Sequence, residues 1–420
     1  MRDRIVSSVS GRNRATWAAC LTFAVGAASA ARAQTAPIPS PLTFEAALDL
    51  ATSRNLGIDA ARRQRAVREA AVRIARQIPN PDIVGEITRD VPHQAFVVDF
   101  PIEIGGKRAR RVDLATEELS LAGVALQAEL RTVRRELRQS FYSLLAADER
   151  VRLAEGVLDI ARRLREAAQS RFETGAAPRL EVLQADLGIT RSETEGDLAR
   201  SLRASAQATL NGVLNVAPEQ TLVVSGSISD HTATPSYDRA VGVATASNPD
   251  LTVFDRQIAI EQRRVALLRV ERLPTPVFSF GGVFNAPGEF DIGPRAGFTI
   301  GLPIFSRNQG EIAASIATAS QLRAARQAAE RRIANAVFSA SAKVEAERRQ
   351  VAAYRQRLVP TATDLESLVE ESYRAGRSSL LAVLDAQRSV RDLTREALQA
   401  ELDLQLAVAE LEELLGTPLP

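Results

Sequence analysis

The stretch that decides the fold occurs twice in this chain, as a turn followed by the start of a helix. The first copy reads Phe172-Glu-Thr-Gly175-Ala-Ala-Pro178-Arg-Leu180-Glu-Val182-Leu183-Gln-Ala185, and the second reads Tyr373-Arg-Ala-Gly376-Arg-Ser-Ser379-Leu-Leu381-Ala-Val383-Leu384-Asp-Ala386. Corresponding residues are 201 positions apart throughout. Because a fixed internal period indicates a repeated structural unit, the sequence predicts two similar halves.

Other landmarks recur in the same order on either side of these turns. Phe44-Glu-Ala-Ala and Asn55 match Tyr237-Asp-Arg-Ala and Asn248, Pro79-Asn-Pro81 matches Pro274-Thr-Pro276, and Phe100-Pro101-Ile102 matches Leu302-Pro303-Ile304. Each half is therefore predicted to run helix, strand pair, long helix, turn and helix. We place the repeats at 34–218 and 237–420, joined by a linker at 219–236 with a short strand candidate at Thr221-Leu-Val-Val-Ser.

The helical segments are long and poor in Gly and Pro. The span from Gly106 to Phe172 is almost uninterrupted, and about 65 helical residues extend on the order of 100 Å. In the last helix, apolar residues recur at steps of three and four: Leu393, Ala397, Ala400, Leu404, Val408, Leu411 and Leu415. This spacing predicts a packed seam like that of a coiled coil.

Four segments alternate instead with the period of a strand, at 82–91, 94–104, 277–286 and 292–304. Asp99 and Glu103 fall on a polar face. The opposite, apolar face is expected to meet lipid and includes Phe96, Val98, Phe100, Ile102, Phe298, Ile300 and Leu302. Such alternation over about ten residues is typical of a membrane β-barrel, although a half-buried soluble sheet has the same period.

Four strands do not close around a lumen, and open sheet edges leave backbone groups unsatisfied in lipid. Other copies of the chain must therefore complete the barrel. This argument predicts an oligomer without fixing the number of copies.

The N-terminus predicts export from the cytoplasm. A basic start, an apolar run from Ala15 to Ala30 and a small-x-small pattern ending at Ala33 indicate a signal peptide over 1–33. The only cysteine, Cys20, lies inside it and is a poor lipidation site. Without this segment 48 basic and 50 acidic residues remain, a net charge near −2 that gives no reason to expect nucleic acid as a partner.

Catalytic and metal-binding patterns are missing from the sequence. His93 is expected in a hairpin turn and His231 in the linker, and the Gly105-Gly106-Lys107 segment lacks the other residues of a phosphate loop. We therefore predict no enzyme activity, no cofactor and no resident metal site.

The duplicated order and the segment from Tyr373-x-x-Gly376 to Val383-Leu384-Asp385-Ala386 resemble the TolC-like outer-membrane efflux family over about 42–416. The resemblance implies a mainly α-helical homotrimer with a twelve-strand barrel in the bacterial outer membrane and a helical tunnel in the periplasm. It also implies a periplasmic adaptor (membrane fusion protein) and an inner-membrane pump of the resistance-nodulation-division type. Ile104-Gly105-Gly106-Lys107-Arg108-Ala-Arg-Arg111 is similar to the heavy-metal cation efflux (CzcC-like) branch.

The resemblance also suggests where function lies. Asp385 matches one of the acidic positions that narrow the pore in family members, whereas the companion position is Ala382 here. The tips expected to meet the adaptor comprise Phe172, Gly175, Pro178, Tyr373, Arg374, Gly376, Arg377 and Ser378. Drug or solvent efflux and a type I secretion duct remain open within this class. A soluble periplasmic adaptor or coiled-coil scaffold is the alternative from another class.

Overall fold

The computed structural model describes residues 38–229, 233, 235–288, 290–417 and 419. Contacts divide the chain into two units, Met1–Pro39 and Ser40–Pro420, and the elements below belong to the second. The predicted signal peptide at 1–33, with Cys20, lies outside the described residues, as does His231.

The helices and strands follow the same order twice. The first series is α1 (Phe44–Arg54), α2 (Leu56–Ala75), β1 (Asp82–Ile87), β2 (Gln94–Pro101), α3 (Lys107–Glu173) and α4 (Arg179–Val213). The second is α5 (Tyr237–Ser247), α6 (Pro249–Glu271), β3 (Val277–Ala286), β4 (Phe290–Thr299), α7 (Gln309–Ala353), η1 (Tyr354–Leu358), α8 (Val359–Arg374) and α9 (Leu380–Leu415). The exact limits that we predict for the two repeats and their linker stay predictions.

The predicted long helix is present in the first half as α3, a single helix of 67 residues. In the second half the equivalent span is divided among α7, η1 and α8. Pro360 lacks an amide hydrogen and therefore disturbs the α-helical bonding just before it. The chain responds with a wide π-helical turn, in which the amide of Val359 donates to the carbonyl of Tyr354.

The seam predicted along α9 lies in an apolar core that α9 shares with α5 and α7. Leu404, Val408, Leu411 and Leu415 are all 3% exposed or less and pack with residues of α5 and α7. Ala397 and Ala400 are also buried, whereas Leu393 is half-buried. The step of three and four residues thus places one continuous stripe of α9 against its neighbours.

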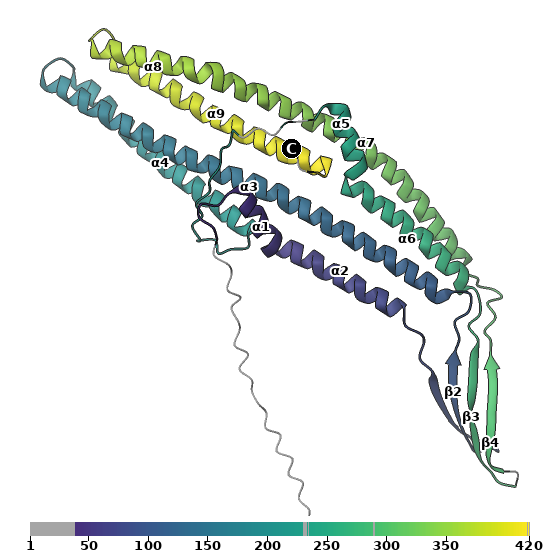
Figure 1. Ribbon diagram of the computed structural model, residues 1–420. Coiled ribbons are helices and arrows are strands. Elements are labelled where there is room, and N and C mark those ends of the chain that lie inside the picture. Colours follow the sequence, from purple (N-terminus) through teal and green to yellow (C-terminus); the bar gives the residue numbers. More distant parts are fainter. Residues whose placement is uncertain (1–37, 230–232, 234, 289, 418, 420) are drawn as a thin grey trace, which may run out of the picture. The chain divides into compact units, whose positions relative to one another are not determined.

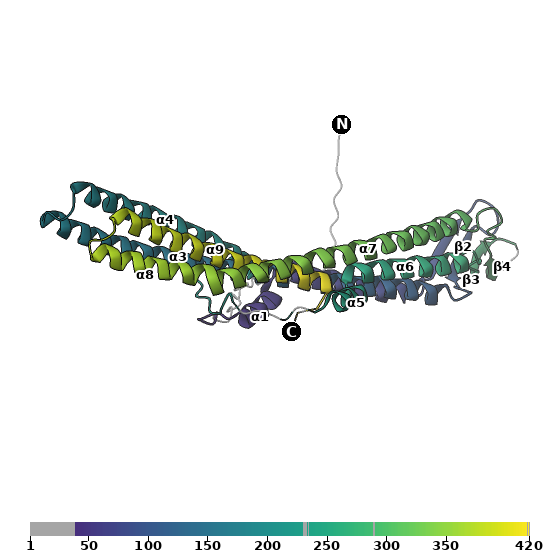
Figure 2. The ribbon, with the colours of Figure 1, turned by 90° about the horizontal axis from the view of Figure 1, so that it is seen from above.

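Within this unit the helices place the sheet and the hairpin turns at opposite ends (Figures 1 and 2). The hairpin α3–α4 runs beside the hairpin formed by α8 and α9, and α3 contacts α9. No helix of the described residues is long and apolar enough to cross a membrane.

The four strands form one antiparallel sheet in the order β1-β2-β3-β4. The two hairpins belong to different halves of the chain and are joined by the pairing of β2 with β3. Directly opposite residues on antiparallel strands share a face, so the row Phe100, Phe278 and Phe298 is apolar across three strands. The next row, Asp99, Ser279 and Gly297, lies on the other face.

Three of the predicted strands are too long. The strand predicted over 82–91 ends at Ile87, and those predicted to reach residue 104 and residue 304 end at Pro101 and Thr299. β2 and β4 end early for the same reason. Their shared neighbour β3 begins at Val277, and Val277 is already paired with Pro101 of β2 and Thr299 of β4. The following residues have no strand beside them in the same chain. Ile102, Ile300 and Leu302 therefore lie beyond the ends of the strands to which we assigned them.

The strand expected at Thr221-Leu-Val-Val-Ser is reduced to a single bridge between Leu42 and Val224. The amide of Leu42 donates to Val223, and Ser225 donates back to the carbonyl of Leu42. Asn211 holds the preceding turn through bonds from its side-chain amide to Ala217, Pro218 and Gln220. Two backbone bonds to Leu42 therefore hold this segment in place of a longer strand ladder, and the Asn211 side chain holds the turn before it.

Candidate functional site

The two repeated turns have the same backbone geometry. Gly175 and Gly376 have φ angles of 72° and 70°, which glycine adopts without steric cost. The amide of Ala176 donates to the carbonyl of Arg171, and Arg377 donates to Ser372 in the same way. Gly175 and Gly376 also donate to the carbonyls of Phe172 and Tyr373. These paired bonds define a Schellman motif at the end of α3 and again at the end of α8.

Tyr373 connects the two hairpins near their turns. Its ring is 4% exposed and packs in a cluster that includes Leu164, Val182 and Leu380. Its hydroxyl donates to Oε2 of Glu181 on α4 at 3.1 Å. The hairpin tips are therefore held together by burial and by a hydrogen bond to a carboxylate.

Arg171 adds a second connection from α3 to the same tyrosine. Its guanidinium carbon lies 4.5 Å from the centre of the Tyr373 ring, and Nη1 donates to the Tyr373 carbonyl at 3.4 Å. Burial raises the pKa of Tyr373, and the Glu181 carboxylate raises it further, whereas Arg171 lowers it. The hydroxyl consequently keeps its proton at neutral pH and remains a donor.

The predicted tip residues divide into an exposed set and a buried one. Those that lie on the surface are Phe172, Gly175, Pro178, Arg374, Gly376 and Arg377. Ser378 is half-buried, and its hydroxyl donates to the carbonyl of Val369. The side chain of Tyr373 packs between the hairpins, and a role for this residue in docking stays a prediction.

Asp385 lies one turn beyond the tip on α9. Its side chain is 61% exposed, and Oδ1 is 3.7 Å from the guanidinium of Arg388. The flanking Val383 and Ala386 are buried, so α9 presents Asp385 on the side opposite its packed face. Its proposed place beside a pore depends on other copies of the chain and stays a prediction.

A groove of about 760 Å³ separates the two hairpins behind the tips. Its walls come from α3, α4, α8 and α9 and combine leucines with charged residues, among them Arg191, Arg388, Glu195 and Glu366. Burial raises the pKa of Glu366, and the neighbouring Glu370 raises it further. Glu366 is half-buried and lines the groove between the two hairpins.

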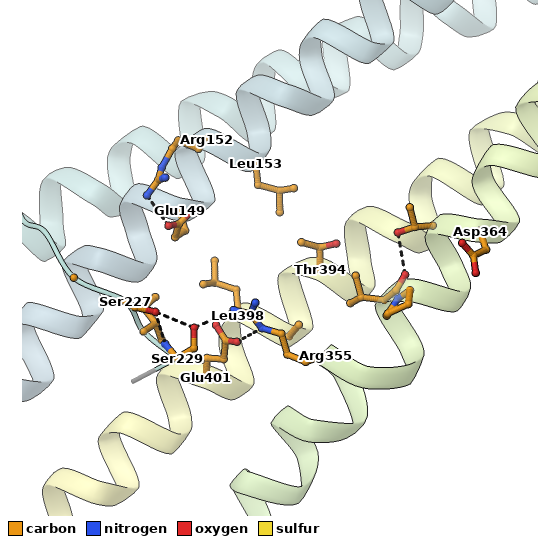
Figure 3. Close-up of a pocket in the computed structure, with 16 residues that line it drawn as sticks. Glu149, Arg152, Leu153, Ser227, Ser229, Arg355, Asp364, Thr394, Leu398 and Glu401 are labelled. Atoms are coloured by element: carbon orange, nitrogen blue, oxygen red, sulfur yellow. Dashed lines mark hydrogen bonds and ion pairs between the residues drawn. The ribbon is translucent and has the colours of Figure 1, made fainter. Parts of the chain in front are cut away.

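A second hollow of about 1010 Å³ lies beside the π-helical turn (Figure 3). Arg355 of η1 pairs there with the buried carboxylate of Glu401 on α9, and its Nη2 lies 3.4 Å from the hydroxyl of Ser229. The hydrogen bond that Arg355 donates to Glu401 raises the pKa of Arg355, which keeps the guanidinium charged. This ion pair joins η1, α9 and the segment between the two repeats.

The turn from β2 into α3 contains the Gly105-Gly106-Lys107 sequence. Lys107 is buried, and its Nζ lies 2.6 Å from the hydroxyl of Thr275. Arg111 binds both carboxylate oxygens of Glu103, at 2.5 and 3.1 Å. The basic residues of this turn thus have structural partners within the chain.

The sheet presents faces of different chemistry. Phe96, Phe100 and Phe298 are 49%, 44% and 70% exposed on the apolar face, where the half-buried Val98 also lies. On the polar face Arg295 of β4 lies 3.8 Å from Glu86 of β1, although these are the two edge strands. The sheet must curl toward the polar face for this pair to meet.

Residues 47–216 and 243–417 match the model of a protein family described as outer membrane efflux protein. The chain belongs to the outer membrane efflux protein family. It is 30% identical to the cobalt-zinc-cadmium resistance protein CzcC of Cupriavidus metallidurans, over 83% of this chain and 84% of that protein. It is also 27% identical to the nickel-cobalt-cadmium resistance protein NccC of Alcaligenes xylosoxydans xylosoxydans, over 63% of this chain and 59% of that protein.

Solved structures agree on the fold of this outer membrane efflux protein. CusC superimposes with a TM-score of 0.74 at 17% identity, covering 89% of this chain and 92% of CusC. VceC of Vibrio cholerae gives a TM-score of 0.71 at 15% identity, covering 89% of this chain and 96% of VceC. The predicted fold class, with long helical hairpins and four strands in each protomer, is confirmed.

Membership also confirms that this efflux protein is a bacterial outer-membrane channel that reaches into the periplasm. Among the described residues, no group of three or more His, Cys, Asp or Glu side chains is placed to hold a metal ion. His93 lies in the predicted hairpin turn, where its amide donates to Asn285.

Sequence reasoning missed two connections of the efflux protein. The bond between Tyr373 and Glu181 joins residues of different repeats, and no repeat offset predicts it. The ion pair between Arg355 and Glu401 was also missed, although Pro360 within a helical stretch is a signal for a local break.

Proposed function

We propose that this outer membrane efflux protein is the export duct of a tripartite system for divalent metal cations. In this proposal a homotrimer receives its cargo from a periplasmic adaptor and an inner-membrane pump. The observation that carries the proposal is the 30% identity to CzcC, a cobalt-zinc-cadmium resistance protein, along more than four-fifths of both chains. The similarity to NccC, a nickel-cobalt-cadmium resistance protein, supports the same cargo class.

The geometry of one protomer supports a duct built from several copies. The sheet has an apolar face for lipid and a polar face toward which it curls, and β1 and β4 leave two open edges. Three copies of four strands supply twelve, enough for a barrel with an open interior. Helix α3 then extends the passage by about 100 Å, at about 1.5 Å per residue.

The tips support a closed resting state and a docking surface. Tyr373, Glu181 and Arg171 hold the α8–α9 hairpin against the α3–α4 hairpin, so opening requires these contacts to break. The exposed Arg374 and Arg377 lie beside this link, where a bound adaptor can alter it. Docking at the tips and opening of the tunnel are thus coupled in this proposal.

Asp385 is proposed to bias the closed end of the tunnel toward cations. Repeated around a trimer axis, this exposed carboxylate forms a ring, and such rings raise the local concentration of cations. The cargo passes through without a tight binding site, as a conduit requires, because tight binding slows release.

A second candidate cargo is a siderophore. The chain is 24% identical to the pyoverdine export protein OpmQ of Pseudomonas putida, over 77% of this chain and 69% of OpmQ. The deciding experiment measures growth of a deletion strain on cobalt, zinc, cadmium and nickel salts, together with export of pyoverdine-like chelators. Metal sensitivity that the intact gene reverses supports metal efflux. Unchanged metal tolerance with a loss of chelator export contradicts it.

A further inference from the structure

An apolar hollow of about 560 Å³ lies on the apolar face of the sheet, at the end nearest the helices. Its walls come from the segment before β1 and from the helix-proximal parts of β2 and β3, and they include Ile78, Pro79, Phe100, Ile102, Phe278 and Phe280. None of the described residues that line it carries a charge. A hollow of this size and lining suits a hydrocarbon chain.

The walls of this hollow are open to solvent in a single protomer. The side chains of Ile78, Phe280 and Ile102 are 68%, 55% and 46% exposed. The ring centroids of Phe100 and Phe280 lie 6.4 Å apart. The hollow continues the apolar face that we expect to meet lipid, because Phe100 belongs to both. A lipid molecule is therefore the neighbour that this surface indicates.

Three arginines meet at the end of α2, directly before the wall residue Ile78. Nε of Arg108 donates to the carbonyl of Arg76 at 2.7 Å, and Arg111 donates to two carbonyls within 75–77 at 3.3 and 3.1 Å. These bonds satisfy carbonyls at the C-terminal end of α2, where positive charge is favourable. Figure 1 shows the end of α2 and the start of α3 at the sheet end of the helices. The arginines thus lie at the edge of the hollow.

Two of these arginines keep donors for a ligand. Arg111 is occupied by both carboxylate oxygens of Glu103. Arg76 and Arg108 are exposed, and within the described part of the chain neither guanidinium pairs with a carboxylate. Toward the described residues Arg108 uses only Nε, so both of its amino groups can bind a phosphate in the paired geometry that guanidinium groups favour.

The second half of the chain contains the same turn without the same charges. Phe100-Pro101 matches Leu302-Pro303, and Gly106 and Asn308 both have positive φ angles directly before α3 and α7. The offset of 202 therefore holds in sequence and in backbone conformation. At this offset, the residues that correspond to Lys107, Arg108, Arg110 and Arg111 are Gln309, Gly310, Ile312 and Ala313. A turn of this kind thus forms without basic residues.

The end of α2 shows the same contrast between the halves. Pro79 matches Pro274 at an offset of 195, so Arg76 corresponds to Glu271. The five basic residues of the first junction therefore correspond to no basic residue in the second. Because the two junctions share a turn and differ in charge, the turn does not account for the arginines. A ligand of opposite charge gives them a role.

We propose that Arg76, Arg108 and the apolar hollow bind an anionic phospholipid from the periplasmic leaflet of the outer membrane. One acyl chain lies in the hollow, and the phosphate accepts hydrogen bonds from the two guanidinium groups. This proposal rests on the lipid-facing sheet of the proposed duct and adds a ligand to it. The helices of the channel reach into the periplasm, so the end of the sheet that joins them lies at the level of the headgroups of that leaflet.

The charge of the junction favours a headgroup with a net negative charge. Segments 73–82 and 101–113 contain six Lys or Arg residues and three Asp or Glu residues, a net charge of +3. Phosphatidylglycerol is an anion, whereas the ammonium of phosphatidylethanolamine cancels the charge of its phosphate. Each basic residue near a membrane surface strengthens binding to an anionic lipid about five-fold. We therefore expect phosphatidylglycerol to be preferred.

The test measures lipid binding by native mass spectrometry of the protein purified from outer membranes in a mild detergent. Phosphatidylglycerol and phosphatidylethanolamine with identical acyl chains are titrated separately. The parent protein is expected to bind phosphatidylglycerol more tightly, and Arg76→Gln with Arg108→Gln should lower that affinity about 25-fold and remove the preference. Arg76→Gln alone breaks no side-chain bond among the described residues and should lower the affinity about five-fold.

The matched control is Arg272→Gln with Arg307→Gln. These two arginines are exposed at the corresponding junction of the second half, and their removal takes away the same charge. The affinity for phosphatidylglycerol should stay that of the parent. Ile78→Gln makes the wall of the hollow polar, and it should weaken the binding of both lipids equally because their acyl chains are identical.

Equal affinity of the parent for the two lipids overturns the proposal, as do equal losses in the two double variants that remove arginines. Complete displacement of phosphatidylglycerol by inorganic phosphate overturns the role of the hollow. The mass of the trimer in the same spectra shows that each variant is assembled. A parent particle that is not a trimer overturns the proposed duct instead.

Discussion

The hydroxyl of Tyr373 lies 3.1 Å from Oε2 of Glu181, and this bond connects α8 with α4 at the end of the molecule farthest from the sheet. Tyr373 and Glu181 are not equivalent positions of the internal repeat, whose two copies are 201 residues apart. Phe172, which the repeat equates with Tyr373, is 41% exposed and has no hydroxyl. One residue of each half therefore takes part in this bond, and Phe172 cannot form an equivalent bond in return.

Removal of this hydroxyl should favour the open duct. Tyr373→Phe keeps the buried ring but loses a hydrogen bond to a carboxylate, which contributes about 1.5–3 kcal/mol. We expect higher conductance of the purified trimer in planar bilayers and greater sensitivity of cells to large antibiotics. Tyr354→Phe is the control, because its hydroxyl also lies 3.1 Å from a glutamate, Glu396, but away from the tips. Equal effects of both variants would contradict a link specific to the tips.

Charge removal at Asp385 should reduce the preference of the channel for cations. Three carboxylates about 10 Å from an axis in water contribute about 1 kcal/mol to a cation on that axis, a several-fold change in relative permeability. Asp385→Asn should therefore shift the reversal potential in a salt gradient toward zero. Asp197→Asn, at an exposed position on α4, is the control. An unchanged reversal potential would show that Asp385 does not face the pore.

Glu366 should make the groove between the hairpins sensitive to pH. Burial, followed by Glu370, raises its pKa above the ordinary 4.5, so the folded protein holds its proton more tightly than the unfolded chain does. Stability then falls as the pH rises from about 4.5 through the raised pKa, and it stays lower above that value.

Glu366→Gln removes this loss at neutral pH. Its melting temperature should exceed that of the parent protein at pH 7.5, and the difference should shrink at pH 4. Glu371→Gln changes an exposed glutamate of the same helix and should leave the pH dependence unchanged. A difference for Glu366→Gln that is independent of pH would argue against titration of this carboxyl.

The turn glycines should be needed for their backbone conformation alone. A Cβ at Gly376 would meet no atom within 4 Å, yet the φ angle of 70° is unfavourable for other residues. Gly376→Ala is expected to destabilise the protein by about 1–2 kcal/mol. Gly123→Ala, inside α3 and equally open, should stabilise it by about 0.5–1 kcal/mol. Thermal unfolding measures both changes, and the same sign for both would refute the backbone explanation.

Much of this fold is readable from the sequence because local patterns dictate it. The glycines at 175 and 376 end helices through their own conformational freedom, and the stripe on α9 is buried as its spacing predicts. The apolar row through Phe100 follows from the two-residue period of a strand. The repeated turn also carries the resemblance to the efflux family, and the match to the family model over 47–216 and 243–417 confirms it.

The sequence by itself thus determined the repeat, the types of elements and the faces of the sheet, because each depends on neighbours a few positions away. Only the tertiary structure decided where β4 stops, because its pairing depends on the start of β3 at Val277. It also decided that Tyr373 is buried against Glu181 and that Arg355 meets Glu401 beside the π-helical turn. These contacts join segments that are distant in the sequence. Packing in three dimensions selects the partners, and no period along the chain predicts them.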